Sequence, residues 1–425
     1  MELQQFEGFT PVDGGVCAAK GFLANGVCCG LSHKALPGEE EKPKADKPKK
    51  NDLAMIYAEN PCSAAAVYTT NKVKGAPILV TKAHLENGMA QAVIVNSVNA
   101  NTCNPDGVEK ALKMCSLAAE GLKLQPSDIV VASTGVIGQV LPIEPIEQAI
   151  PALVEGLTSD GNNRAMEAIM TTDTRPKQLA VEFKIGDTVC RMGGMLKGSG
   201  MIHPNMATTL TFITTDAAIA PAMLQQALSD VVKQTLNRVS VDGDTSTNDM
   251  VCVMASGKAG NPTIKKNDAN YETLKKALYI VMMNLARMMA RDGEGATKLI
   301  TCICTKAASE QTAETVAKSV ITSSLFKTAM FGEDANWGRI LCAIGYADAE
   351  FNINKVSVDI ASAAGSIAVC REGVGVEFSE ETAKTVLSEE EIEILISLNE
   401  GEAGAIAWGC DLTYDYVKIN GDYRS

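Results

Sequence analysis

Thr208 is a candidate hydroxyl nucleophile that would work without a histidine partner. The stretch GSGMIHPNMATTLTFITTD at 198–216 joins a glycine-rich loop with a Pro-Asn turn to the strand-like residues 207–213. Thr208 lies where loop and strand meet, a position usually held by an ordinary strand residue. If the chain is cut before Thr208, the new α-amino group supplies the base that a hydroxyl nucleophile needs. With a reference pKa of about 7.7 to 8.0, that amine is partly unprotonated near neutral pH.

The histidines give little support to serine–histidine–acid catalysis. The chain has three, His33, His84 and His203, and it lacks the G-x-S-x-G turn of a hydrolase nucleophile. Only His203 lies near the candidate nucleophile, in the loop before the strand. A structural role is expected for each of the three.

Several motifs fall short of a metal or phosphate site. VDGDTSTND at 241–249 begins like a calcium loop, but Thr247 stands at the glycine position and Val253 at the position of the bidentate glutamate. We interpret it as a polar turn that supports another site. STGVIG and GGMLKGSG match neither glycine pattern of phosphate binding. The cysteine pairs at 28–29 and 302–304 lack zinc-site spacing and histidine partners, so no metal is expected.

Composition favours a large globular protein of the cytoplasm. The 425 residues are 46% hydrophobic, and the formal net charge of −13 argues against binding a phosphate backbone. No stretch is long enough to cross a membrane, the start MELQQFEGF lacks a secretory signal, and the first arginine is Arg164. Thirteen scattered cysteines without an export signal are expected to be reduced thiols. We therefore expect no nucleic-acid or membrane partner.

Strand and helix patterns alternate along the chain. Residues 91–97 and 128–134 are predicted to form buried strands, with a helix between them over about 108–117, capped near Gly121. This alternation predicts the mixed α/β fold class.

Two longer helices are predicted from their apolar faces, which consist of Leu224, Leu228, Val231, Val232, Thr235 and Val239, and of Leu274, Leu278, Val281, Met282, Leu285 and Met288. The second helix is expected to end at Asp292-Gly293, and the strand-like residues 297–304 follow. The charged, proline-containing residues 37–52 are predicted to form a solvated loop, because they bury too little to order themselves.

The sequence around Thr208 resembles the self-cleavage segment of the ArgJ family, the ornithine acetyltransferases or bifunctional glutamate N-acetyltransferases. The likeness covers essentially the whole chain, because the family's motifs follow in order: GGVCAAKGF, VYTTNKVKGAP, ASTGVIG, TTDTRPK, KGSGMIHPNMATTLTFITTDA, VDGDTSTND, ARDGEGATKL, KTAMFGEDANWGRI and YVKINGDYRS. The resemblance implies cleavage between Ala207 and Thr208. Residues 1–207 would then be an α chain and residues 208–425 a β chain of one intertwined catalytic unit.

The resemblance also implies the reaction. Thr208 would attack the acetyl carbonyl of N-acetylornithine, release ornithine, and hold the acetyl group as an ester until the amino group of glutamate takes it. This is a ping-pong acyl transfer of arginine biosynthesis. No cofactor is implied, although bifunctional members also accept acetyl-CoA, and the sequence does not separate the two kinds of member.

By the same resemblance, Thr134 and Gly135 form the oxyanion hole. The residues agree with this role, because a glycine after a strand end can expose a backbone N–H next to a hydroxyl donor. The implied substrate-binding residues, besides Thr208, are Thr174, Lys197, Glu294, Asn420 and Ser425. We expect Lys197 to pair with a substrate carboxylate and Glu294 with the δ-ammonium of ornithine. Without the motif, Glu294 would be interpreted as a solvated residue after a helix end.

Three features depart from the family pattern. Val98 replaces the usual glycine in NSVNAN, Ser425 replaces the final threonine, and the 37–52 insert is longer than usual. We expect Val98 to reshape the loop after its strand, whereas none of the three changes touches the nucleophile.

The family's fold is a layered α/β/β/α arrangement, similar to N-terminal nucleophile hydrolases but with different connectivity. Processed chains in the family stay associated and pair further, so an α2β2 or larger homo-oligomer is implied. Two alternatives stay open. One is a self-processing aminopeptidase of similar fold, which hydrolyses its acyl-enzyme and usually has a serine nucleophile. The other is a non-catalytic scaffold on a degenerate copy of the fold, which predicts a missing catalytic position.

Overall fold

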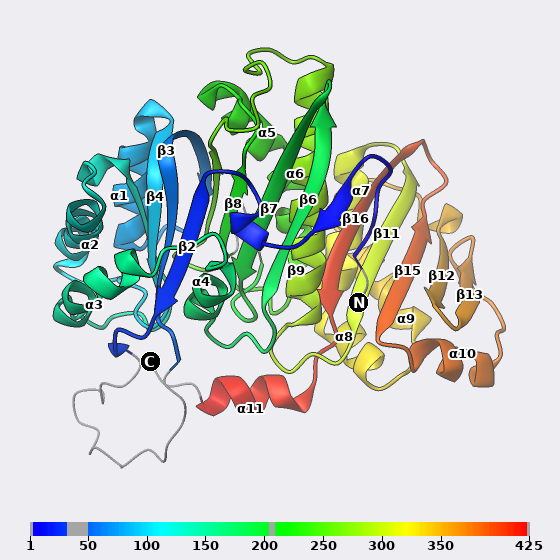
Figure 1. The fold of residues 1–425 in the computed structure, drawn as a ribbon. Coiled ribbons are helices and arrows are strands. Elements are labelled where there is room, and N and C mark those ends of the chain that lie inside the picture. The colour runs from blue at the N-terminus through cyan, green and yellow to red at the C-terminus, as the bar shows by residue number, and fades with distance from the viewer. Residues whose placement is uncertain (1–2, 32–49, 204–208, 423–425) are drawn as a thin grey trace.

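The protein forms two β-sheets that stand side by side, with helices packed against both (Figure 1). The structure is a computed structural model and describes residues 3–31, 50–203 and 209–422. It confirms the mixed α/β fold class.

The first sheet carries Lys197 at the end of one strand, and Thr134 and Gly135 directly follow another. Its nine strands run in the order β1 (Thr10–Val12), β6 (Lys177–Ile185), β7 (Thr188–Lys197), β8 (Leu210–Thr215), β10 (Met250–Ala255), β3 (Leu53–Tyr68), β4 (Met89–Asn96) and β5 (Ile129–Ser133), with β2 (Phe22–Val27) paired to β3. β8 and β10 are parallel, as are β4 and β5. Because parallel strands share one carboxyl edge, the ends of β4 and β5 at Asn96 and Ser133 lie together.

The second sheet is built mainly from the C-terminal part of the chain. Its seven strands run in the order β14 (Val374–Gly375), β13 (Gly365–Arg371), β12 (Ser357–Ser362), β15 (Glu391–Ser397), β11 (Leu299–Ala307), β16 (Ala403–Cys410) and β9 (Val239–Ser240). Cys302 and Cys304 of β11 share a buried face, as the two-residue period of a strand dictates. The predicted strand at 297–304 is therefore confirmed, although it begins two residues and ends three residues later.

Helices cover both sheets. α1 (Ala76–His84), α2 (Gly107–Leu122), α3 (Glu144–Glu155) and α4 (Asn162–Ile169) pack on the first sheet around β2 to β5. α7 (Glu310–Thr322), α8 (Ser324–Phe331), α9 (Trp337–Gly345) and α10 (Glu380–Leu387) share one apolar core with the second sheet. α11 (Tyr414–Asp422), the last described helix, buries none of its residues.

One long helix, α6 (Ala269–Arg291), links the two sheets. Asp268 caps its start by accepting hydrogen bonds from the N–H groups of Asn270 and Tyr271. Its apolar side chains contact β6 and β7 of the first sheet and β11 and β16 of the second, with α5 (Pro221–Gln234) alongside. The predicted core face is buried, as shown by Leu274, Leu278, Val281, Met282 and Leu285. The helix also ends where the sequence predicts.

The helix predicted over 108–117 is longer than expected. It continues as α2 to Leu122, since Gly121 stays helical and packs closely against Ile150 of α3. Lys123 ends the helix instead, in the left-handed conformation with φ of +58°. The cap predicted near Gly121 was therefore wrong by two residues, because helix packing favoured glycine within the helix.

The helix predicted through Val239 is shorter than expected. α5 ends at Gln234, residues 236–238 form a tight turn, and Val239 begins β9. Thr235 and Val239 are buried, as the apolar pattern indicated, but outside the helix. A periodic pattern records burial and does not show where the hydrogen-bonded helix stops.

The loop predicted over 37–52 lies mostly outside the described residues, but its end differs from the prediction. Asp52 is buried and accepts a hydrogen bond from the Cys29 N–H at 2.6 Å. Lys50 donates to the carbonyl of Met170 at 2.8 Å. The chain is thus already ordered against its neighbours before β3 begins.

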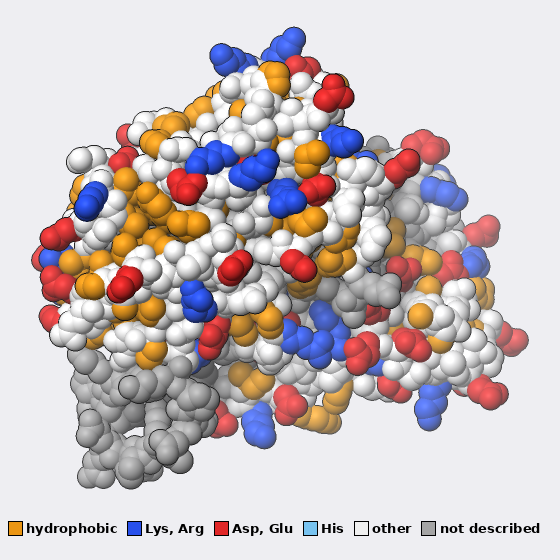
Figure 2. All heavy atoms as spheres, in the orientation of Figure 1, with side chains coloured by type: hydrophobic (Ala, Val, Ile, Leu, Met, Phe, Trp, Pro, Cys, Tyr) orange, Lys and Arg blue, Asp and Glu red, His pale blue; other side chains and the backbone are white. Residues whose placement is uncertain are grey.

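The face of the molecule drawn in Figure 2 is not strongly basic. Figure 2 shows Lys and Arg side chains interspersed with Asp and Glu over the side in view. None of the described helices has the length and apolar content that crossing a membrane requires. None of the thirteen cysteines, all of which lie within the described ranges, is paired in a disulfide.

Candidate active site

Thr134 and Gly135 follow β5 directly and line a cavity of about 150 Å³. The Thr134 N–H donates to the Asn96 carbonyl at 3.0 Å, which holds the end of β5 against β4. Gly135 has φ of +126°, and a Cβ at this position would lie 2.1 Å from the Val98 carbonyl oxygen. Both the backbone conformation and the close approach therefore require glycine.

The backbone around Gly135 leaves a donor available for a ligand. No described residue accepts a hydrogen bond from the Gly135 N–H, whereas the next N–H, of Val136, donates to Val98 at 3.0 Å. Together with the Thr134 hydroxyl, this N–H offers the two donors that an oxyanion hole uses. Val98 meets Gly135 through its backbone, and its side chain packs on the apolar core of α1 to α3. The side chain that departs from the family pattern thus points away from the site.

Lys197 is the last residue of β7, and it lines the cavity together with Thr134 and Gly135. Its Nζ donates a hydrogen bond to Thr134 Oγ1 over 3.1 Å. Burial lowers the pKa of Lys197, although the carboxylates of Asp173 and Asp249 act in the opposite direction. Because the lysine uses the lone pair of the hydroxyl oxygen, the hydroxyl proton stays free to bind a ligand.

Glu294 and Asn420 also line this cavity. The Asn420 side-chain amide donates to Glu294 Oε2 over 2.7 Å, so α11 is fastened to the loop after α6. A Cβ on Gly200 would lie 2.4 Å from the Glu294 carboxyl group. The glycines of the Lys197 loop therefore make room for this acid, which faces the cavity together with Lys197.

Thr174 lies next to this cavity and not in its wall. Its N–H and hydroxyl both donate to the carboxylate of Asp292, and it lines a neighbouring cavity of about 330 Å³. Two threonines of the same motif, Thr171 and Thr172, line the cavity with Lys197 instead. The TTDT motif pointed to this segment, but the sequence did not show which threonine faces inward.

A residue that we did not predict, Asp249, lies directly before β10. It is 3% exposed and lines a small recess of the site with Thr134, Lys197 and Thr209. Burial raises the pKa of Asp249 well above its usual value. Its Oδ2 has no hydrogen-bond partner among the described residues. The VDGDTSTND motif contained this residue, yet only the fold reveals that its carboxyl group belongs to the site.

Asn248 was also not predicted, and it braces the oxyanion loop. Its amide donates to the carbonyls of Ala100 at 2.6 Å and Ser133 at 2.9 Å, and its Oδ1 accepts from the Thr102 hydroxyl at 2.6 Å. These contacts join the loops after β4 and β5 to the start of β10. The motif is thus a support for another site, as we interpreted it.

The predicted cleavage point, Ala207 and Thr208, and the predicted substrate contact Ser425 lie outside the described residues. The first described residue after the cleavage point is Thr209, which lines the small recess with Thr134 and Lys197. β8 begins at Leu210, later than the strand predicted from residue 207. The chain therefore enters the sheet at the predicted oxyanion residues.

The remaining candidates have structural contacts. Asp242, from the calcium-like motif, accepts hydrogen bonds from the N–H groups of Met201 at 2.6 Å and Ile202 at 2.8 Å. His203 meets Ser240 at 3.1 Å, and burial lowers its pKa. Within the described ranges, no group of three or more His, Cys, Asp or Glu side chains could hold a metal ion.

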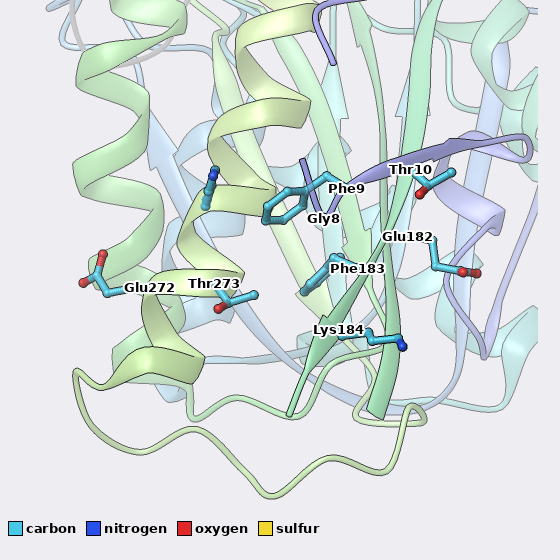
Figure 3. A pocket seen from close by; sticks show the side chains of 9 residues that line it. Gly8, Phe9, Thr10, Glu182, Phe183, Lys184, Glu272 and Thr273 are labelled. Carbon is cyan, nitrogen blue, oxygen red and sulfur yellow. The ribbon is translucent and has the colours of Figure 1, made fainter. Parts of the chain in front are cut away.

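A larger, open cavity of about 680 Å³ lies far along β6 from the site (Figure 3). Phe9 and Phe183 stack there with ring centres 5.9 Å apart, and the Lys276 ammonium lies 5.3 Å from the Phe9 ring centre. Glu182, at its edge, is already paired with Arg191. The cavity contains none of the predicted site residues, so its size does not make it the better candidate.

Comparison with known proteins decides the family. A model of the ArgJ family matches residues 41–425. The chain belongs to this family. A curated ArgJ relative, the arginine biosynthesis bifunctional protein ArgJ 1 of Clostridium acetobutylicum, is 49% identical over 377 residues, 88% of this chain and 92% of that protein. The ArgJ protein of Symbiobacterium thermophilum is 48% identical and covers 97% of this chain and 99% of its own.

Solved ArgJ structures are similar to parts of the chain. The ArgJ protein from Bacillus halodurans is 48% identical, with a TM-score of 0.47, over 49% of this chain and 97% of that chain. The ornithine acetyltransferase of Mycobacterium tuberculosis, solved with ornithine, is 33% identical, with a TM-score of 0.40, over 47% of this chain and 100% of that chain.

Proposed function

We propose that this chain is a glutamate N-acetyltransferase of arginine biosynthesis, which moves the acetyl group from N-acetylornithine to glutamate through an ester on Thr208. One observation carries the proposal in a chain of the ArgJ family. Thr134, Gly135 and Lys197 line one cavity, and Thr209, directly before β8, lines a small recess with Thr134 and Lys197. Donors for an oxyanion and a route for a nucleophile are thus next to each other.

The chemistry follows from a threonine at a new N-terminus. Its α-amino group takes the hydroxyl proton while Oγ attacks the acetyl carbonyl, and the Gly135 N–H and Thr134 hydroxyl stabilise the oxyanion. When the intermediate collapses, the C–N bond breaks and ornithine leaves with the proton on its α-amino group. The amino group of glutamate then attacks the ester, and its proton returns to the Thr208 hydroxyl as N-acetylglutamate departs.

Opposite charges in the lining of the cavity suit an amino-acid substrate. The Lys197 ammonium group contacts Thr134, and the Glu294 carboxylate lines the same cavity. We assign the substrate carboxylate to Lys197 and the δ-ammonium of ornithine to Glu294. Thr171, Thr172 and Asn420 are among the other residues that line the cavity. Thr174 does not line the cavity and contributes indirectly, through its hydrogen bonds to Asp292. Ser425 is proposed as a substrate contact on the family match alone.

Three further properties belong to this proposal. Residues 1–207 and 208–425 are the α and β chains, which remain associated and assemble as α2β2 or larger. Acetyl-CoA is a second acetyl donor, since the curated relatives are named bifunctional. The enzyme works in the cytoplasm, in keeping with its scattered free thiols.

The deciding experiment is intact mass spectrometry of the protein with N-acetylornithine in the absence of glutamate. Wild type should give two fragments, with the one that begins at Thr208 heavier by one acetyl group. Glutamate should remove the acetyl group and appear as N-acetylglutamate. Thr208→Ala should stay uncut and unlabelled. An aminopeptidase would lose its acyl group to water without glutamate, and a scaffold would show neither cleavage nor an adduct. Replacing N-acetylornithine by acetyl-CoA tests the second donor.

A further inference from the structure

Three segments that carry predicted substrate contacts converge on one buried group of charges. They are the TTDTRPK segment, the KGSG loop after β7, and the DGEG loop after α6. Between them, Lys177 Nζ lies 2.6 Å from Asp173 Oδ1 and 2.5 Å from Asp292 Oδ2. The side chains are 1%, 0% and 6% exposed, so this buried triad is shielded from solvent.

Asp173 connects the triad to the lysine loop. Its Oδ1 also accepts a hydrogen bond from the Gly198 N–H at 2.8 Å, and its Oδ2 accepts from the Thr171 N–H at 2.9 Å. Gly198 follows Lys197 directly, so this bond fixes the backbone from which the lysine reaches Thr134. Burial alone would raise the pKa of Asp173, but the ammonium groups of Lys177 and Lys197 outweigh it and the pKa lies below its usual range.

Asp292 connects the triad to the other two segments. Its carboxylate accepts from the N–H of Thr174 at 3.1 Å and from the Thr174 hydroxyl. Its backbone carbonyl accepts from the Ser199 hydroxyl, and the Ser199 carbonyl accepts from the Glu294 N–H at 3.0 Å. The lysine loop and the glutamate loop are therefore tied to each other as well as to the triad.

We propose that Asp173, Lys177 and Asp292 are positioning residues that set the separation of Lys197 from Glu294 and thereby the affinity of the site for its amino-acid substrates. The inference rests on the proposed function for the identity of those substrates. None of the three lines the cavity that holds the predicted oxyanion residues. They act through the segments to which they are bonded.

The triad explains why a lysine is buried here at all. Lys177 is the first residue of β6 and does not line the cavity, yet its ammonium group neutralises carboxylates that accept backbone N–H groups. Removing its charge leaves two buried carboxylates facing each other without compensation, which forces the segments apart. A displacement of about 1 Å in a binding site is enough to cost up to about a hundredfold in rate.

The test compares Lys177→Met and Asp292→Asn with Arg238→Met in the processed, full-length protein. Arg238 is a matched control, because it is 8% exposed, bridges Glu310 and Glu314, and belongs to no predicted site. In both triad variants, the KM for N-acetylornithine and for glutamate should rise by about tenfold or more, with a smaller change in kcat. Lys177→Arg should restore part of the affinity, and Arg238→Met should keep wild-type KM values.

Hydrogen exchange provides a readout that does not depend on activity. The amides of Gly198 and Glu294 should lose protection in Lys177→Met and keep it in Arg238→Met. Unchanged KM values in an active, folded triad variant would overturn the proposal, as would unchanged protection at both amides. If Lys177→Met does not fold, Asp292→Asn, which keeps the side-chain volume, carries both measurements. Failure of wild type to transfer acetyl groups would instead refute the proposed function, while the exchange data still decide the role of the triad.

Discussion

The Lys197 ammonium donates to the Thr134 hydroxyl across 3.1 Å, and this contact joins β7 to the loop after β5. A positive group on the hydroxyl oxygen makes its proton a better donor toward a developing oxyanion. The same ammonium lines the cavity that we propose binds the substrate. Under the proposed function, we therefore expect Lys197 to contribute both to substrate binding and to transition-state stabilisation, so that its loss affects both.

Replacing the Thr134 hydroxyl should slow catalysis without unfolding the protein. In Thr134→Val, kcat for acetyl transfer should fall by about a hundred- to a thousandfold, because one oxyanion donor is lost. The matched control is Thr235→Val, whose buried hydroxyl donates to Val231 far from the site. Steady-state kinetics and thermal melting check both variants. Equal activities in the two would remove Thr134 from the oxyanion hole.

Substitutions at Gly135 and Gly138, both in the loop after β5, distinguish the effect of steric crowding from the effect of a strained backbone conformation. Gly135→Ala should abolish activity, since its Cβ would lie 2.1 Å from the Val98 carbonyl oxygen. Gly138 also has positive φ, of +81°, but nothing lies within 4 Å of a Cβ there. Gly138→Ala should therefore cost only about 1 to 2 kcal/mol of stability and keep its activity. Urea unfolding and acetyl-transfer assays make the comparison, and an active Gly135→Ala would contradict the close approach of the Val98 carbonyl to this position.

Glu294→Gln should weaken discrimination by substrate charge. Wild type should prefer N-acetylornithine over an uncharged isostere of the same length, and the variant should lose about ten- to a hundredfold of that preference in kcat/KM. Glu182→Gln, which alters a paired glutamate at the distant open cavity, serves as the control. Unchanged discrimination in Glu294→Gln would assign the δ-ammonium to another group.

Asp249 should give the folded state a distinctive pH dependence. Its raised pKa keeps it protonated where unfolded aspartates, with a pKa near 3.9, are ionised, so the folded state binds one proton more. This group makes its largest contribution to the free energy of unfolding below about pH 4. That contribution is lost as the pH rises toward the pKa of Asp249 in the folded state. Asp249→Asn should lack that decline, whereas Asp359→Asn, at a more exposed ion pair, should retain it.

Denaturant titrations between about pH 4 and pH 8 measure this difference. Both variants are made on a Thr208→Ala background, so that cleavage does not alter the reference state. Parallel curves for the parent and Asp249→Asn would show that the carboxyl group is ionised in the folded protein.

Local sequence patterns predicted the elements well wherever neighbouring residues decide them. The strands around 91–97 and 128–134 and the buried face of α6 follow from the periodicity of their apolar residues. Boundaries failed at Gly121 and Thr235, because packing between distant helices and sheets decides where a helix ends. Motifs identified the segments of the site, including Thr134, Gly135 and Glu294.

The sequence by itself determined the family and the mixed α/β fold, and it supplied the prediction that Thr208 becomes an N-terminal nucleophile. Only the tertiary structure decided which side chains meet. In the structure, Thr171 and Thr172 line the cavity, whereas Thr174 donates a hydrogen bond to Asp292. Asp249 lines the same small recess as Lys197. The orientation of these side chains depends on burial and on hydrogen bonds between residues far apart in the chain. The spacing of neighbouring residues in the sequence therefore cannot predict it.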